Sequence, residues 1–188
     1  MIRTLGTERP AFLLETERTG YVFRMLPTGQ PEQLYYGRRV ALETEAELEA
    51  VTEKRAFPEG GTTSYDPEHP ELTLEDACLE FSGLGKGDLR EPMLELVNPD
   101  GSRTNDFLYE SHVIDDAQPA QRPLPGSYAE DGKAEHLCVT YRDRNYGLAL
   151  EQHYYVWADC DCICRKCVLR NDAAAPIDIE RLLSEMLK

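Results

Sequence analysis

The fold is decided by the stretch Gly85-Lys86-Gly87-Asp88-Leu89-Arg90-Glu91-Pro92, which is followed by a strand and the turn Asn98-Pro99-Asp100-Gly101. Its glycines permit backbone angles that are unfavourable for other residues, so the sequence predicts a shaped loop that holds Asp88 and Arg90 in place. These opposite charges either form an ion pair that fixes the loop or grip a polar ligand. Charge pairs in glycine loops are commonly structural, so we prefer the ion pair.

The residues after this loop predict a β-hairpin. Residues 93–97 have the composition of a strand, and residues 105–114 follow the Pro-Asp-Gly turn with a second one. A turn of this kind between two apolar runs is typical of a tight chain reversal. We therefore expect the two strands to pair antiparallel with each other.

The residues before the loop predict short strands and one helix. Residues 11–16, 21–26 and 34–36 are expected to be strands, the first two joined by a turn. The sequence Thr44-Glu45-Ala46-Glu47 has the form of a capping box, which predicts a short helix near residues 44–54. Irregular sequence continues to residue 70, and such stretches are often functional.

The C-terminal third predicts a run of antiparallel strands. Residues 137–143 and 148–157 are expected to pair around a turn, followed by strands at 162–169 and 177–183. Together these give about nine strands joined mostly by short turns. We expect an all-β fold, a large antiparallel sandwich that forms a single domain over residues 1–188.

The charge of the chain excludes two classes of partner. With 35 acidic and 20 basic side chains, the formal net charge is −15. This charge repels nucleic-acid phosphates and anionic lipid headgroups, so we expect no nucleic-acid and no membrane partner. The N-terminus lacks the apolar core of a signal peptide, which favours a cytoplasmic protein.

The spacing of the cysteines and histidines favours positions in the protein core over a metal site. Of the six cysteines, four lie in the run Cys160-x-Cys162-x-Cys164-x-x-Cys167. On a strand the first three would share one face and Cys167 the other, so the four do not converge as zinc ligands do. The four histidines are scattered, with no two at helical chelating spacing. We expect reduced thiols and no metal.

Short motifs recur in a characteristic order and spacing across most of the chain. The motifs are Tyr21-Val22-Phe23, Leu34-Tyr35-Tyr36-Gly37, residues 85–92, Asp100-Gly101-Ser102, Asp106-Phe107, Tyr109-Glu110-Ser111-His112, Leu124-Pro125, Ser127-Tyr128, Tyr154-Tyr155-Val156, Ile163-Cys164-Arg165, Asn171 and Arg181-Leu182-Leu183-Ser184. With this order and spacing the chain resembles the N-terminal domain of bacterial α-galactosidases of glycoside hydrolase family 36.

The resemblance implies a galactose-mutarotase-like antiparallel β-supersandwich whose catalytic (β/α)₈ barrel and C-terminal β domain are absent from these residues. It implies a retaining enzyme that removes terminal α-1,6-linked galactose from melibiose and raffinose without a cofactor. The two catalytic aspartates belong to the barrel, so no catalytic residue is assigned here. The implied partners are the protein's own catalytic domain, further copies in a homo-oligomer, and the galacto-oligosaccharide.

In oligomeric relatives a loop of this domain contributes substrate contacts, and the matching region follows Phe57. Asp66 is the implied substrate-binding residue, although Gly60 to Ser64 depart from the commoner pattern. Two alternatives stay open. One is a free-standing carbohydrate-binding module with Trp157 in an aromatic platform. The other is an assembly domain that touches no sugar.

Overall fold

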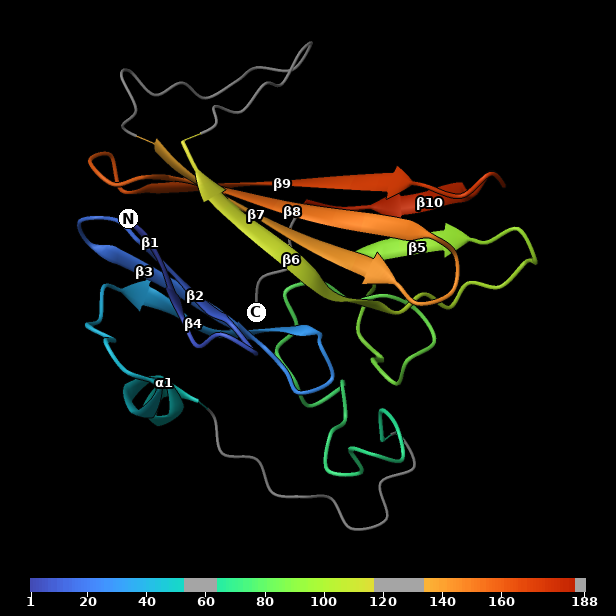
Figure 1. Ribbon diagram of the computed structural model, residues 1–188, viewed down its shortest axis with the longest axis horizontal. Coiled ribbons are helices and arrows are strands. Elements are labelled where there is room, and N and C mark those ends of the chain that lie inside the picture. Colours follow the sequence, from blue (N-terminus) through green and yellow to red (C-terminus); the bar gives the residue numbers. More distant parts are fainter. Residues whose placement is uncertain (53–63, 117–133, 185–188) are drawn as a thin grey trace.

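The computed structural model describes residues 1–52, 64–116 and 134–184, which form three antiparallel sheets and one helix (Figure 1). The elements in chain order are β1 (Ile2–Leu5), β2 (Ala11–Glu15), β3 (Thr19–Met25), β4 (Pro31–Arg38), α1 (Glu45–Val51), β5 (Leu94–Val97), β6 (Phe107–Asp115), β7 (Ala134–Asp143), β8 (Leu148–Trp157), β9 (Cys162–Asn171) and β10 (Asp178–Leu182). The all-β antiparallel class with one short helix is confirmed. β1 was not predicted. The predictions for residues 53–63 and the motifs Leu124-Pro125 and Ser127-Tyr128 lie outside the described residues.

Two four-stranded sheets form the sandwich, with strand orders β1-β2-β3-β4 and β6-β7-β8-β9. Their facing sides share one apolar core, because side chains alternate along each strand and the inward set is apolar. Phe23 of β3 stacks on Tyr154 of β8 with ring centroids 5.0 Å apart. Contacts of this kind hold the two sheets face to face.

The helix covers the other face of the β1–β4 sheet, as Figure 1 shows. Leu48 of α1 packs there against Leu13 and Val22, so β2 is buried on both faces. The predicted capping box is present: the Glu47 N–H donates to Thr44 Oγ1 at 3.2 Å, and the Thr44 N–H donates to Glu47 Oε2 at 2.9 Å. The helix ends at Val51, so it is shorter than the predicted 44–54.

The predicted hairpin of 93–97 with 105–114 is wrong. β5 pairs with β10, and β6 pairs with β7. The turn itself forms, since the Gly101 N–H donates to the Asn98 carbonyl at 2.8 Å. After it, the carboxylate of Asp143 at the end of β7 accepts a hydrogen bond from the Asp106 N–H at 2.8 Å. This bond anchors the chain beside β7, so the strand that follows registers with β7 instead of returning along β5.

A buried ion pair joins the two large sheets through the loop before β5. Glu80 is 0 % exposed, and its Oε2 lies 2.9 Å from Nη2 of Arg165 on β9. The hydroxyl of Tyr154 donates to the same carboxylate at 2.7 Å, and Tyr21 of β3 donates to its other oxygen. The guanidinium also lies over the Tyr154 ring, 5.0 Å from its centroid. Both charges are therefore paired and hydrogen-bonded, as buried charges must be.

No helix in the described part of the chain is long and apolar enough to cross a membrane.

Arg165→Met is expected to lower the free energy of unfolding by about 3–5 kcal/mol, because it leaves the Glu80 carboxylate buried without its cation. Urea denaturation followed by circular dichroism measures this loss. The matched control is the double variant Glu80→Gln/Arg165→Met, which removes both charges and should recover part of the stability. A double variant less stable than Arg165→Met alone would contradict the assignment.

Candidate functional site

The loops between α1 and β5 gather at one edge of the β1–β4 sheet (Figure 1, green). They enclose a small apolar cluster of their own, in which Tyr65, Leu74 and Leu79 pack with Leu26 at the end of the β3 segment. Gln33 in β4 bonds to this region twice: its backbone N–H donates to the Cys78 carbonyl at 2.6 Å, and its side-chain oxygen accepts from the Cys78 thiol at 3.5 Å. The loops are thus held to the sheet by backbone bonds and packing, and all three residues singled out from the sequence lie in them.

Asp88 and Arg90 form the expected ion pair. Arg90 Nε donates to Asp88 Oδ1 at 2.7 Å, and Nη2 donates to Oδ2 at 2.9 Å, which is the two-pronged geometry of a strong guanidinium–carboxylate pair. The same guanidinium donates to the carbonyls of Ala77 at 2.6 Å and Leu74 at 3.1 Å. The pair therefore joins the glycine loop to the segment before it, and its donors are engaged within the protein. That its role is structural stays a prediction.

The glycine loop depends on Gly85. Its φ is +89°, and a Cβ at this position would lie 2.1 Å from Oγ1 of Thr104. Gly87 also has a positive φ of 83°. Both the left-handed backbone and the close approach to Thr104 require glycine, which explains why the sequence places it here.

Asp106 is the centre of a polar network beneath these loops that sequence reasoning did not identify. Its Oδ2 accepts a hydrogen bond from the Tyr65 hydroxyl at 2.7 Å and lies 3.5 Å from Lys86 Nζ, while Oδ1 accepts from Gln30 Nε2 at 3.2 Å. Burial and this bond to a carboxylate raise the pKa of Tyr65 well above its usual value. These three partners come from separate segments, so only the folded chain brings them to Asp106. The Asp106-Phe107 motif was the one signal in the sequence.

Asp66 lies on the surface of the same region and organises a tight turn. Its Oδ1 accepts hydrogen bonds from the N–H groups of Glu68 at 2.9 Å and His69 at 2.8 Å, and lies 3.0 Å from His69 Nδ1. Partial desolvation acts to raise the pKa of Asp66, but the bonds from His69 and Glu68 lower it overall, so the side chain is a carboxylate. None of these bonds uses Oδ2.

A charged hollow lies elsewhere on the described surface, between the β2–β3 turn and the segment after β4. Among its described lining residues are Glu15, Arg18, Arg38, Arg39 and Glu43, and its volume is about 880 Å³. Its charges pair with one another: Arg39 Nε lies 3.3 Å from the buried carboxylate of Glu15. The hollow is lined by charged groups and Ala41, with no aromatic ring among them to stack on a sugar.

The aromatic residue proposed for sugar stacking is buried. Trp157 is 5 % exposed and packs with Ala134 and Tyr155. A ring in this position has no free face for a ligand.

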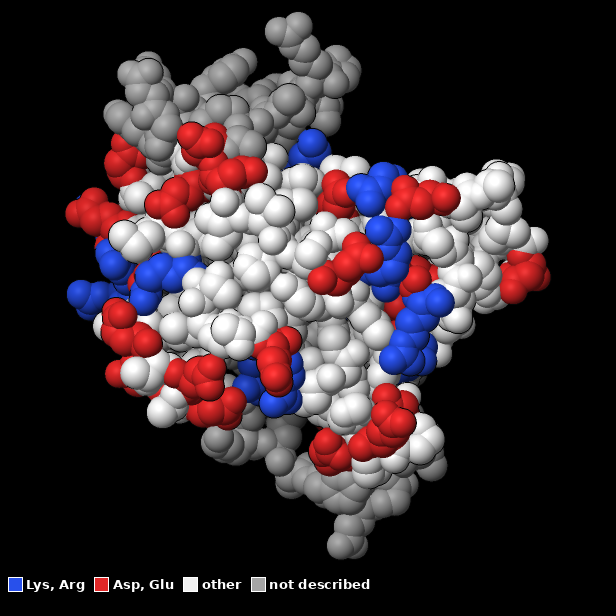
Figure 2. All heavy atoms as spheres, viewed as in Figure 1, with Lys and Arg blue, Asp and Glu red and all other residues white. Residues whose placement is uncertain are grey.

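On the face shown in Figure 2, basic side chains lie beside acidic ones and form no continuous positive surface.

The cysteine run is arranged partly as expected. Cys162 and Cys164 share one face of β9, with their sulfurs 3.7 Å apart, and Cys167 packs against the main core on the other face. Cys160 instead lies exposed in the turn before the strand, so the prediction of three thiols in a row is wrong. A different set, Cys138, Glu151 and His153, gathers donor atoms that could hold a metal ion. Its members lie on β7 and β8, two strands whose pairing was predicted, and the register of that pairing places Cys138 opposite His153.

Comparison with known proteins identifies relatives over the whole described fold. The model of the family described as "Glycosyl hydrolase family 36 N-terminal domain" matches residues 29–188. The α-galactosidase Mel36A of Lactobacillus acidophilus is 26% identical over 182 residues, which cover 94% of this chain and 24% of that protein. The bifunctional α-galactosidase/sucrose kinase AgaSK of Mediterraneibacter gnavus is 26% identical over 176 residues, 94% of this chain and 18% of that protein.

Among solved structures, the α-galactosidase from Lactobacillus brevis superimposes with a TM-score of 0.85 at 26% identity. The superposition covers 96% of this chain and 24% of that one. The chain thus spans about a quarter or less of the length of these relatives.

Asp88→Ala is expected to lower the free energy of unfolding by about 2–3 kcal/mol, less than for a fully buried pair because Arg90 is partly exposed. The substitution leaves the guanidinium bonded only to carbonyls. A thermal melt should show the lower melting temperature.

The control is Glu180→Gln, which breaks the exposed Arg103–Glu180 pair, 2.6 Å between charged atoms, and should leave the melting temperature nearly unchanged. If Asp88→Ala melts at the temperature of the unmodified chain, the ion pair does not fix the loop.

Proposed function

This chain belongs to the glycoside hydrolase family 36 N-terminal domain family, and we propose on that premise that it is the non-catalytic N-terminal part of an α-galactosidase. One observation carries the proposal: the fold of the Lactobacillus brevis enzyme covers 96% of this chain, while this chain covers 24% of that enzyme. We propose that residues 1–188 form one domain, and that the catalytic residues belong to a barrel outside it. The substrate class is terminal α-1,6-linked galactose, as in melibiose and raffinose.

The first task that we propose for the domain is to support the catalytic barrel. Large apolar side chains are exposed in the loop before β5, on β10 and directly after β10: Leu89 is 74 %, Ile179 54 % and Leu183 46 % exposed. These segments are held together by a bond from the Leu183 N–H to the Met93 carbonyl, 3.0 Å long. Exposed apolar groups gathered in this way favour a surface that another domain or another copy covers. Barrel support and assembly into a homo-oligomer both use such a surface.

The second task is to lend a loop to substrate binding. Asp66 is held rigidly by its own turn, so its carboxylate meets a ligand at little cost in side-chain entropy. The arrangement supports a positioning contact with a sugar hydroxyl. The free thiols of the described cysteines are in keeping with the cytoplasmic location that we propose.

The structure favours this role over a free-standing carbohydrate-binding module. The module requires an exposed aromatic platform, but Trp157 is buried and the charged hollow has no ring among its described lining residues. Calorimetric titration of raffinose into the chain separates the two functions. Saturable binding would favour the module, and no detectable heat would favour the supporting domain.

The purified 188-residue chain is expected to show no turnover of p-nitrophenyl α-galactoside, because the proposed catalytic residues lie outside it. A colorimetric assay of released p-nitrophenol measures this, with a complete family 36 α-galactosidase as the positive control. Turnover that persists at constant specific activity through further purification would overturn the non-catalytic assignment.

In the complete enzyme that we propose, Asp66→Asn should raise KM for raffinose about tenfold with kcat little changed, since a hydrogen bond to a charged group contributes about 1.5–3 kcal/mol. Steady-state kinetics on raffinose measures both constants. The control Glu68→Gln alters a neighbouring exposed carboxylate and should leave KM unchanged. Equal KM values for Asp66→Asn and the unmodified enzyme would remove Asp66 from substrate binding.

A further inference from the structure

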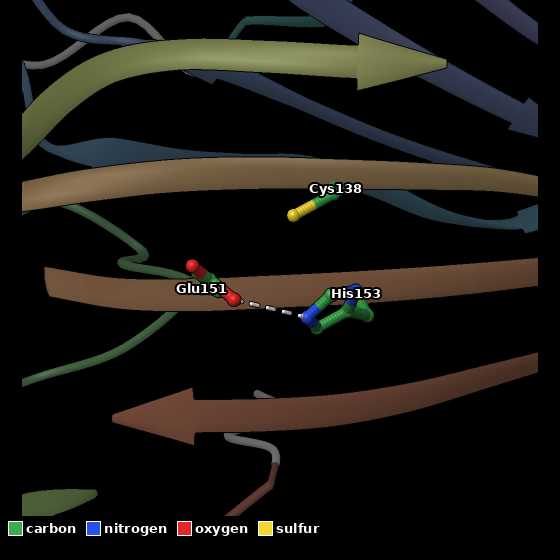
Figure 3. Close-up of side chains that lie close together, drawn as sticks. All are labelled: Cys138, Glu151 and His153. Atoms are coloured by element: carbon green, nitrogen blue, oxygen red, sulfur yellow. Dashed lines mark ion pairs between the residues drawn. The ribbon is translucent and has the colours of Figure 1, made fainter. Parts of the chain in front are cut away.

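The outward face of the β6–β9 sheet carries a cluster of polar side chains that the α-galactosidase function does not use. Cys138 on β7 lies directly opposite His153 on β8 in the strand register, and Glu151 is two residues before His153 on the same face. Figure 3 shows the sulfur, the carboxylate and the imidazole directed toward a common space. One donor atom from each residue lies within 4.8 Å of the others.

The spacing of two of these donors, on Glu151 and His153, suits a small divalent cation. His153 Nε2 lies 3.6 Å from Glu151 Oε2. Tetrahedral zinc with nitrogen and oxygen ligands at its usual bond lengths separates those ligands by about 3.4 Å. The side chains of Glu151 and His153 are 20 % and 15 % exposed, so the position is partly desolvated yet open to solvent.

A second layer of hydrogen bonds orients the histidine for this task. The side chain of His136 joins Asp115 Oδ1 to His153: its Nδ1 lies 2.7 Å from that oxygen, and its Nε2 lies 2.9 Å from His153 Nδ1. These contacts fix the orientation of the His153 ring, whose Nε2 is directed toward the Glu151 carboxylate. A deprotonated imidazole nitrogen and a carboxylate oxygen are both electron-pair donors of the kind that bind zinc.

The chain Asp115–His136–His153 has the form of the carboxylate–histidine pairs that support metal ligands. Two positive charges near the three donors repel a cation. Lys166 on β9 is the register partner of His153, and Arg170 pairs with Oε1 of Glu151. Arg170 also pairs with Asp172 at 2.8 Å, so its charge is shared with a second carboxylate.

We propose that Cys138, Glu151 and His153 bind one zinc-class divalent cation, with His136 as a positioning residue and solvent in the remaining coordination position. Thiolate, imidazole and carboxylate donors together select zinc over magnesium or calcium, which prefer oxygen alone. Binding converts the Cys138 thiol to a thiolate and releases one proton to solvent. The site is independent of the galactosidase assignment.

Titration of the metal-free 188-residue chain with Co²⁺ tests the proposal. One equivalent should produce a thiolate-to-cobalt charge-transfer band in the near ultraviolet, and Zn²⁺ should displace it. Cys138→Ser should abolish the band, while His136→Asn, which touches no metal, should weaken binding about tenfold or more. Arg170→Gln should tighten binding, because it frees Glu151 from its competing partner.

The control is the triple variant Cys160→Ser/Cys162→Ser/Cys164→Ser, which should retain the band. Circular dichroism of each variant checks that it folds. If Cys138→Ser does not fold, the tighter cobalt binding expected for Arg170→Gln still tests the site. A band lost in the triple variant and kept in Cys138→Ser would assign the metal to the β9 thiols and overturn the proposal. So would the absence of any cobalt band in the unmodified chain.

Discussion

The two large sheets depend on a charge pair that water does not reach. Removing Glu80 and Arg165 from solvent is unfavourable, and the cost is offset only because the partners come from different parts of the fold: a loop, β9, and the tyrosines of β3 and β8. The apolar core would tolerate many small shifts of one sheet over the other, whereas a buried carboxylate with fixed donors tolerates few. The pair therefore specifies how the sheets align, and it fixes the loop that leads to the glycine segment and β5.

The β6–β9 sheet has two chemically different faces. Its inward side chains, such as Leu137, Tyr141 and Leu150, are fully buried among apolar neighbours. Its outward side chains include histidines, carboxylates and thiols whose donor atoms face one another across the strands. A sheet that served only to cover a core would need no ordered polar groups outside. The hydrogen-bonded row from Asp115 to His153 is as specific as the core on the other side, which is why a function for that face is worth seeking.

Sequence patterns predicted the strands, the helix and the glycine loop. Alternation located most strands, the capping box located α1, and the glycines with Asp88 and Arg90 located a fixed loop, because each depends on residues close in the chain. Pairing was harder: the turn at Asn98–Gly101 formed, yet its flanking strands joined different sheets, since Asp143 holds the chain beyond the turn. The network around Asp106 was not predicted because its members come from separate loops, and the row from Asp115 through His136 to His153 depends on the register of β6 against β7, which was not predicted. Asp66 was placed by family resemblance, and nothing in its local geometry alone assigns it to a sugar.

The pairing of β5 with β10 has a consequence for the order in which the protein assembles. Val97 meets its partner Asp178 only after every strand of the β6–β9 sheet has been synthesised. Until then β5 has no strand on that side, whereas β1 to β4 pair with their sequence neighbours as they leave the ribosome. An unpaired apolar strand is a site for wrong pairing between nascent chains. β10 thus completes the pairing of β5, and chains interrupted before Asp178 would expose β5 to aggregation while most of the sandwich was already built.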